Sequence, residues 1–264
     1  MVIWLLGFQI ERNPFTILIL NLAIADFGNL VFIATPYLCF FILFDLPRLL
    51  NWINTFFLQI MYINGIFLLI AISIDRCVCV LFPIWHRCSR PKHLSSAVCA
   101  FLCIFSFLLV GIQIIMVHKF EYGSWQYLHL VIPSVLGLPL ITISTLILFV
   151  KICSKARQIK RRRMLVMILI TLLCFLILTL PLPIFMLMHF LNFLTWGQLH
   201  RLQECFNLGA CLNSSVNPII YYLVGRKKRA QTRESIKVVF QRVFREDEPP
   251  ESTENATNRV STSL

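Results

Sequence analysis

The run Asn217-Pro218-Ile219-Ile220-Tyr221 ends the last long apolar stretch of the chain, shortly before the basic run Arg226-Lys227-Lys228-Arg229. A proline inside an apolar helix removes one backbone hydrogen bond and clashes with the preceding turn, so it bends the helix. The asparagine lies in the same turn and can bond the freed backbone groups. The tyrosine follows about one turn below, where the basic run indicates that the helix leaves a membrane.

The composition of the chain is that of a membrane protein. Of its 264 residues, 58% are hydrophobic and 14% are charged, whereas a soluble domain carries about a quarter charged residues. The net charge is +12, but the basic residues cluster between the apolar runs and do not cover one face. This distribution argues against nucleic-acid binding.

Six apolar segments are long enough to cross a bilayer, which takes roughly 20 residues. They cover residues 15–44, 56–81, 93–117, 128–152, 164–190 and 199–224. Residues 1–8 are apolar but too short to cross, and we interpret them as the remnant of a first helix. The expected fold is therefore an all-α membrane protein, a seven-transmembrane helix bundle over residues 1–225 with an incomplete first helix.

The distribution of lysine and arginine predicts the orientation, because loops rich in these residues stay in the cytoplasm. One alternating set of connections holds only Arg48, Lys119 and Arg201. The other set is strongly basic and contains Arg12, Arg87, Arg90, Lys92, Lys151, Lys155, Arg157, Lys160, Arg161, Arg162 and Arg163. The second set is expected to be cytoplasmic, as is the C-terminus.

Two segments follow the bundle. Residues 226–245 are expected to form a cytoplasmic amphipathic helix with Ile236, Phe240, Val243 and Phe244 on its apolar face. Residues 246–264 are polar and rich in serine and threonine, which is typical of a disordered tail. The last four residues, Ser261-Thr262-Ser263-Leu264, fit a ligand of a PDZ domain, although so short a match is common by chance.

The ten cysteines predict free thiols and no metal centre, because most of them lie inside apolar segments: Cys77, Cys79, Cys99, Cys103, Cys174 and Cys211. Paired cysteines with the spacing of a metal site do not occur. The sequence also contains no nucleophile with a matched base and no phosphate-binding loop. We therefore expect no catalytic residues.

Asp26 is a carboxylate near the middle of the first complete span, where an ionisable side chain is costly and usually faces the bundle interior. Asn213 and Asn217 are four residues apart and so share one helical face, with Ser214 next to the first of them. We predict that Asp26 shares a hydrated polar cavity with these three residues. The alternative is a polar core residue without a special role.

Asp75-Arg76 closes the second complete span. One interpretation is an interfacial pair that reaches toward the lipid headgroups. However, this pair and residues 217–221 both lie at the ends of the appropriate apolar segments, far apart in the sequence. Together they resemble the signature of rhodopsin-like G protein-coupled receptors.

Three longer runs resemble the Mas-related G protein-coupled receptors within that class. They are Arg12-Asn13-Pro14-Phe15-Thr16, Phe82-Pro83-Ile84-Trp85-His86-Arg87-Cys88 and Glu234-Ser235-Ile236-Lys237-Val238-Val239. The resemblance covers nearly the whole chain. It also accounts for Asn51, which stands where most receptors have the cysteine of their extracellular disulfide.

The resemblance implies an activation mechanism. Asp75 would hold Arg76 by a charge-assisted hydrogen bond in the resting state, and activation would free Arg76 to meet a Gα subunit as the sixth helix moves outward. Arg161 stands where many receptors place an acid that locks this arginine. The remaining residues that the resemblance assigns to coupling and activation are Pro139, Thr179, Pro181, Asn217, Pro218 and Tyr221.

The resemblance implies as partners a heterotrimeric G protein, arrestin at the Ser/Thr-rich tail, and an extracellular peptide or small ligand. A sodium ion beside Asp26 is the one cofactor that it implies, and Gly65 weakens this expectation because related receptors often have a serine there. Leu58 stands where amine receptors have an aspartate, which disfavours a monoamine ligand. Candidate residues of the ligand pocket, each equally explained as packing, are Leu58, Tyr62, Gln113, Trp125, Phe185 and His189.

Two further hypotheses compete with a receptor at the plasma membrane. A transporter or channel would need polar residues along a continuous path, or an internal repeat. A truncated, non-signalling isoform or fragment would follow from the incomplete first helix, and retention in the endoplasmic reticulum is then expected.

Overall fold

The structure is a computed structural model that describes residues 3, 14–43, 47–82, 91, 93–120, 128–154, 169–174, 176–178, 188, 207–217 and 219, nearly all of them helical. It contains four long helices: α2 (Pro14–Leu43), α3 (Arg48–Leu81), α5 (Leu94–Phe120) and α6 (Leu128–Ser154). The predicted amphipathic helix 226–245, the tail 246–264 and most of residues 1–8 lie outside the described residues.

The helices of the described part present apolar side chains outward, as expected for a protein whose solvent is lipid. Phe41 is 84% exposed, Ile42 74% and Ile177 73%. By length and composition, Pro14–Ile42, Arg48–Leu81 and Leu94–Met116 can each cross a membrane. Hydrophobic burial cannot hold such helices together in lipid, so packing and interhelical hydrogen bonds must do so.

The predicted boundaries of α2, α5 and α6 agree with the structure to within one residue at their starts, but that of α3 was wrong. The helix begins at Arg48, eight residues before the predicted start at residue 56. Asn51, Asn54 and Thr55 interrupt the apolar run just before the predicted start. The backbone nevertheless starts its helical bonding here, because the Asn51 N–H donates to the Pro47 carbonyl at 3.0 Å.

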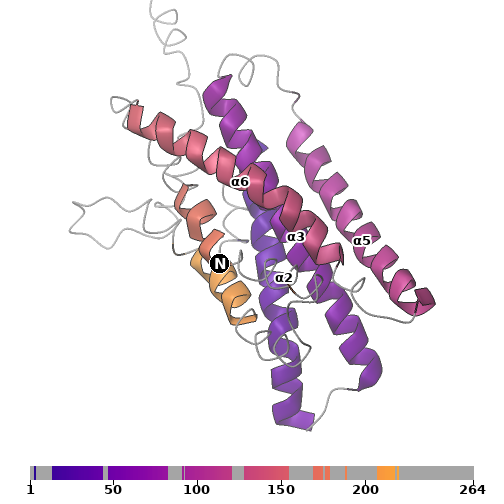
Figure 1. Cartoon of the computed structure of the whole chain (residues 1–264). Coiled ribbons are helices and arrows are strands. Elements are labelled where there is room, and N and C mark those ends of the chain that lie inside the picture. The colour runs from indigo at the N-terminus through magenta and orange to yellow at the C-terminus, as the bar shows by residue number, and fades with distance from the viewer. Residues whose placement is uncertain are drawn as a thin grey trace, which may run out of the picture.

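α3 lies at the centre of the four long helices, since it packs against α2, α5 and α6. In Figure 1, α6 crosses over α3 and α5 runs to one side of it. At 34 residues, α3 is about 51 Å long. It is therefore long enough to reach from one membrane surface to the other. It carries Leu58 and Tyr62 of the predicted ligand pocket as well as the pair Asp75-Arg76.

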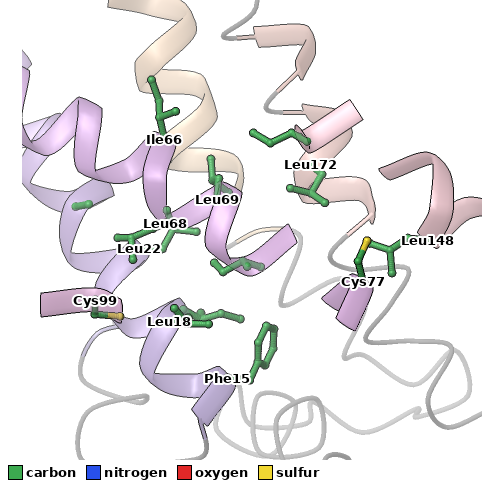
Figure 2. Packing of buried hydrophobic residues seen from close by; sticks show 14 residues of the cluster. Phe15, Leu18, Leu22, Ile66, Leu68, Leu69, Cys77, Cys99, Leu148 and Leu172 are labelled. Atoms are coloured by element: carbon green, nitrogen blue, oxygen red, sulfur yellow. The ribbon is translucent and has the colours of Figure 1, made fainter. Parts of the chain in front are cut away.

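The core between α2 and α3 is built from successive turns. Figure 2 shows Phe15, Leu18 and Leu22 along α2, close to Leu68 and Leu69 of α3. Each of these five side chains is no more than 3% exposed. Phe15 therefore belongs to a close-packed interface although it lies in the first turn of its helix.

Pro36 leaves a gap in the backbone bonding of α2 that α3 fills. A proline has no N–H, so the carbonyl four residues earlier, that of Phe32, loses its helical partner. The Nδ2 of Asn54 donates to this carbonyl at 2.9 Å, and the ring of Phe57 stacks on that of Phe32 with centroids 5.6 Å apart. Asn54 is 6% exposed, so this bond is shielded from competing water.

Two glycines allow close approaches between helices. A Cβ at Gly137 of α6 would lie 2.5 Å from Cδ1 of Ile70 on α3. A Cβ at Gly209 would lie 2.9 Å from the carbonyl oxygen of Leu178. Small residues at such crossings are typical of membrane helix bundles.

Candidate functional site

Asp26 of α2 is joined to the helical segment 207–217 by two side-chain hydrogen bonds. The Oγ of Ser214 donates to its Oδ1 at 3.0 Å, and the Nδ2 of Asn217 donates to its Oδ2 at 2.7 Å. Asp26 is 9% exposed and both donors are 3% exposed. The structure thus brings together three of the four residues that were predicted to share a polar cavity.

The fourth residue, Asn213, lines a cavity of about 20 Å³ beside Asp26, together with Asn29, Tyr62 and Gly65. A volume of about 10–15 Å³ accommodates one water molecule, so this cavity has room for a water or a small cation. Among the described residues, the Oδ1 of Asn29 and the hydroxyl of Tyr62 are buried without a hydrogen-bond partner. The cavity therefore offers polar atoms that a bound water or cation would satisfy.

Gly65 leaves one wall of this cavity open. A Cβ built on Gly65 meets no atom within 4 Å. A serine at this position would consequently fit without displacing a neighbour and would add a hydroxyl oxygen to the wall.

Arg76 is buried near the end of α3, with only 2% of its surface exposed. Its Nη2 lies 3.6 Å from Oδ2 of Asp75, which is an ion-pair distance and longer than a hydrogen bond. Its guanidinium carbon lies 3.4 Å from the ring centroid of Phe15 in α2. Arg76 is therefore held between an acid on its own helix and an aromatic face on the neighbouring one.

Phe15 was quoted in the sequence only as part of a family-like run and was not predicted as a site residue. Sixty-one positions separate it from Arg76, and no spacing pattern connects residues across two helices. The signal that could have found it is the combination of a buried arginine with an aromatic residue at the same membrane depth on the adjacent helix.

Cys77 follows Arg76 in the chain, and its thiol donates to the carbonyl oxygen of Ser144 in α6 at 3.4 Å. Pro139, which was predicted to take part in activation, lies inside α6 and is exposed. Among the cysteines whose side chains the structure describes, Cys39, Cys77, Cys79, Cys99, Cys103, Cys174 and Cys211 are free thiols. No cluster of metal ligands occurs among the described residues.

The predicted ligand-pocket residues are only partly described. Tyr62 lines the Asp26 cavity, while Leu58 on α3 and Gln113 on α5 are half-buried. Trp125, Phe185 and His189 lie outside the described residues. The same is true of the predicted activation residues Thr179, Pro181, Pro218 and Tyr221.

Comparisons with known proteins agree with this arrangement. Residues 1–221 match the 7 transmembrane receptor (rhodopsin family). The chain is 35% identical to Proto-oncogene Mas of Rattus norvegicus, over 98% of this chain and 82% of that protein.

It is also 37% identical to Mas-related G-protein coupled receptor member D of Homo sapiens, over 97% of this chain and 83% of that receptor. With member H of Mus musculus the identity is 33%, over 97% and 82% respectively. The chain belongs to the rhodopsin family of seven-transmembrane receptors, in the group of Mas and the Mas-related G protein-coupled receptors.

Proposed function

We propose that this receptor activates heterotrimeric G proteins and that Arg76 is the residue that contacts the Gα subunit. The observation that carries the proposal is the burial of Arg76, which is 2% exposed near the end of α3. An interfacial arginine would extend its charged head into water. The head is instead buried beside Asp75 and Phe15. This burial supports a resting state in which the guanidinium is not accessible to Gα.

The family determines the class and the location of the protein. A receptor of this kind is a multi-pass protein of the plasma membrane and is not an enzyme. An agonist can only shift the equilibrium between closed and open forms if it binds the open form better. In the open form the sixth helix would lie further out, and the groove so formed would admit the end of Gα beside Arg76.

The chemistry of its lining supports the proposal of a sodium ion in the cavity beside Asp26. A hard cation takes oxygen ligands, and the cavity offers the carboxylate of Asp26 and the unpartnered Oδ1 of Asn29. Both carboxylate oxygens already accept hydrogen bonds from Ser214 and Asn217. Gly65 contributes no ligand, so sodium would bind weakly and would stabilise the resting state by binding it preferentially.

The ligand of the receptor is proposed to be a peptide or a small molecule without an essential ammonium group. Leu58 supports this, because α3 has no counter-charge at that position for a buried amine. The Ser/Thr-rich tail 246–264 supports arrestin as a further partner, and its last four residues support a PDZ domain.

Nucleotide exchange on purified G proteins tests the proposal without knowledge of the ligand. The full chain is reconstituted in lipid nanodiscs and mixed in turn with a purified heterotrimer of each Gα class. Exchange above that of empty nanodiscs with at least one class is the expected result. No increase with any class would contradict coupling to G proteins.

A further inference from the structure

The guanidinium carbon of Arg76 lies over the ring of Phe15, 3.4 Å from the ring centroid. Phe15 belongs to the first turn of α2 and Arg76 to the last turns of α3, so the contact joins two helices. Both side chains are buried, with 3% and 2% of their surfaces exposed. Water therefore does not compete for the face of the ring.

The electrostatics of Arg76 give this contact a specific role. A buried guanidinium loses its hydration and needs compensation from its surroundings. Asp75 supplies one charge, with its Oδ2 at 3.6 Å from Nη2 of Arg76, a distance that is longer than a hydrogen bond. The negative face of an aromatic ring attracts a cation most strongly where water is excluded, which is the situation at Phe15.

We propose that Phe15 is a positioning residue for Arg76: its aromatic face holds the guanidinium in the buried orientation, and release of this cation–π contact is part of activation. The inference rests on the proposed function of Arg76 as the contact to Gα. Phe15 also belongs to the hydrophobic core cluster that contains Leu18, Leu22 and Cys77. The test must therefore separate the charge distribution of the ring from its shape.

Fluorination of the ring makes this separation, because fluorine withdraws charge from the aromatic face and changes the shape little. Phenylalanine with one, two or three ring fluorines is introduced at position 15 of the full chain by stop-codon suppression. The same series at Phe32 is the matched control, since Phe32 is on the same helix but stacks on Phe57 and contacts no cation in the described structure. Phe15→Leu and Phe15→Tyr provide a second, genetically encoded pair.

The first readout is the reactivity of Arg76 itself. Purified protein in nanodiscs is treated with phenylglyoxal, which modifies accessible guanidinium groups, and the modified fraction at Arg76 is followed by mass spectrometry. We expect the rate to rise with each fluorine at position 15, to about tenfold in total, as loss of a desolvated cation–π contact implies. Phe15→Leu should act in the same direction and Phe15→Tyr should not, while fluorination at Phe32 should leave the rate unchanged.

The second readout is ligand-free nucleotide exchange on the purified G protein. We expect it to rise in parallel at position 15 and to disappear when Arg76→Ala is added. Unchanged reactivity of Arg76 across the fluorinated series would overturn the role of Phe15, even if the receptor couples through Arg76. Raised reactivity without exchange in any variant would instead refute the proposed function and leave the cation–π restraint established.

Discussion

Asn217 donates a hydrogen bond from its Nδ2 to the Oδ2 of Asp26 at 2.7 Å, and so joins two residues that are 191 positions apart in the chain. The bond connects the proline-containing motif at the end of the bundle with the carboxylate of α2. Both side chains are buried, so water does not compete for this bond, and a partner left without it would be costly to bury. It therefore ties the segment 207–217 to a buried acid of α2.

Replacing Asn217 by alanine should lower the free energy of unfolding by about 1–3 kcal/mol, because one side-chain oxygen of Asp26 loses its donor inside the bundle. The measurement is thermal unfolding of the purified receptor in detergent. Ser215→Ala is the control on the same segment, since Ser215 is exposed. A loss as large in the Ser215 variant would show that the segment, and not this bond, is sensitive.

Sodium dependence should appear when Gly65 is replaced by serine. The serine would fit the open wall of the cavity and add an oxygen ligand beside Asp26. We expect the midpoint of thermal unfolding to rise in sodium chloride relative to the same concentration of potassium chloride, by more than in the wild type. Asp26→Asn should remove the difference.

Gly111→Ser is the matched control for this experiment. A Cβ at Gly111 also meets nothing within 4 Å, but this glycine is on α5 and does not line the cavity. An equal sodium effect in both serine variants would mean that sodium does not bind beside Asp26.

Asn54→Leu should cost about 1–2 kcal/mol of stability, because it leaves the Phe32 carbonyl buried without a donor. In a Pro36→Ala background the new N–H at position 36 can bond that carbonyl, so the cost of Asn54→Leu should fall to less than half. Unfolding of the four proteins of this double-mutant cycle checks the coupling. Equal costs in both backgrounds would disprove the role of Asn54 as the donor that replaces the missing N–H of Pro36. Asn51→Ala, at an exposed side chain of the same helix, should be neutral.

The crossing of α3 and α6 should tolerate Gly137→Ala only after space is made for it. The added methyl group would overlap Cδ1 of Ile70, and overpacking costs about 1–3 kcal/mol. Ile70→Val removes that carbon and should recover most of the loss in the double variant. Failure of Ile70→Val to rescue stability would mean that α6 does not approach α3 at this point.

Local patterns in the sequence account for most of what could be predicted. The apolar run and Pro14 at its start define α2, and the costly carboxylate of Asp26 points to polar partners four residues apart on one face. The start of α3 was missed because polar residues such as Asn51 interrupt the apolar run without ending the helix. Hydropathy reports the lipid-exposed length, whereas backbone bonding continues beyond it.

The contacts of Arg76 and Asn54 could not be predicted in the same way. Whether Phe15 meets Arg76, or Asn54 meets the Phe32 carbonyl, depends on the rotation and vertical register of α2 against α3. Those are set by packing along the whole interface, including close approaches such as the one at Gly28, where a Cβ would lie 3.0 Å from Met61. A single sequence carries no local signal of that register.

Removal of the Arg76 side chain tests the account most directly. In nucleotide exchange with the most responsive purified heterotrimer, Arg76→Ala should reduce the receptor-dependent rate at least about tenfold, the scale of one lost charged contact. Its surface expression should stay near that of the wild type, and Arg48→Ala, at the exposed opposite end of α3, should leave both quantities unchanged. An undiminished exchange rate in a well-expressed Arg76→Ala receptor would show that Arg76 only packs against Phe15 and Asp75 and does not contact Gα.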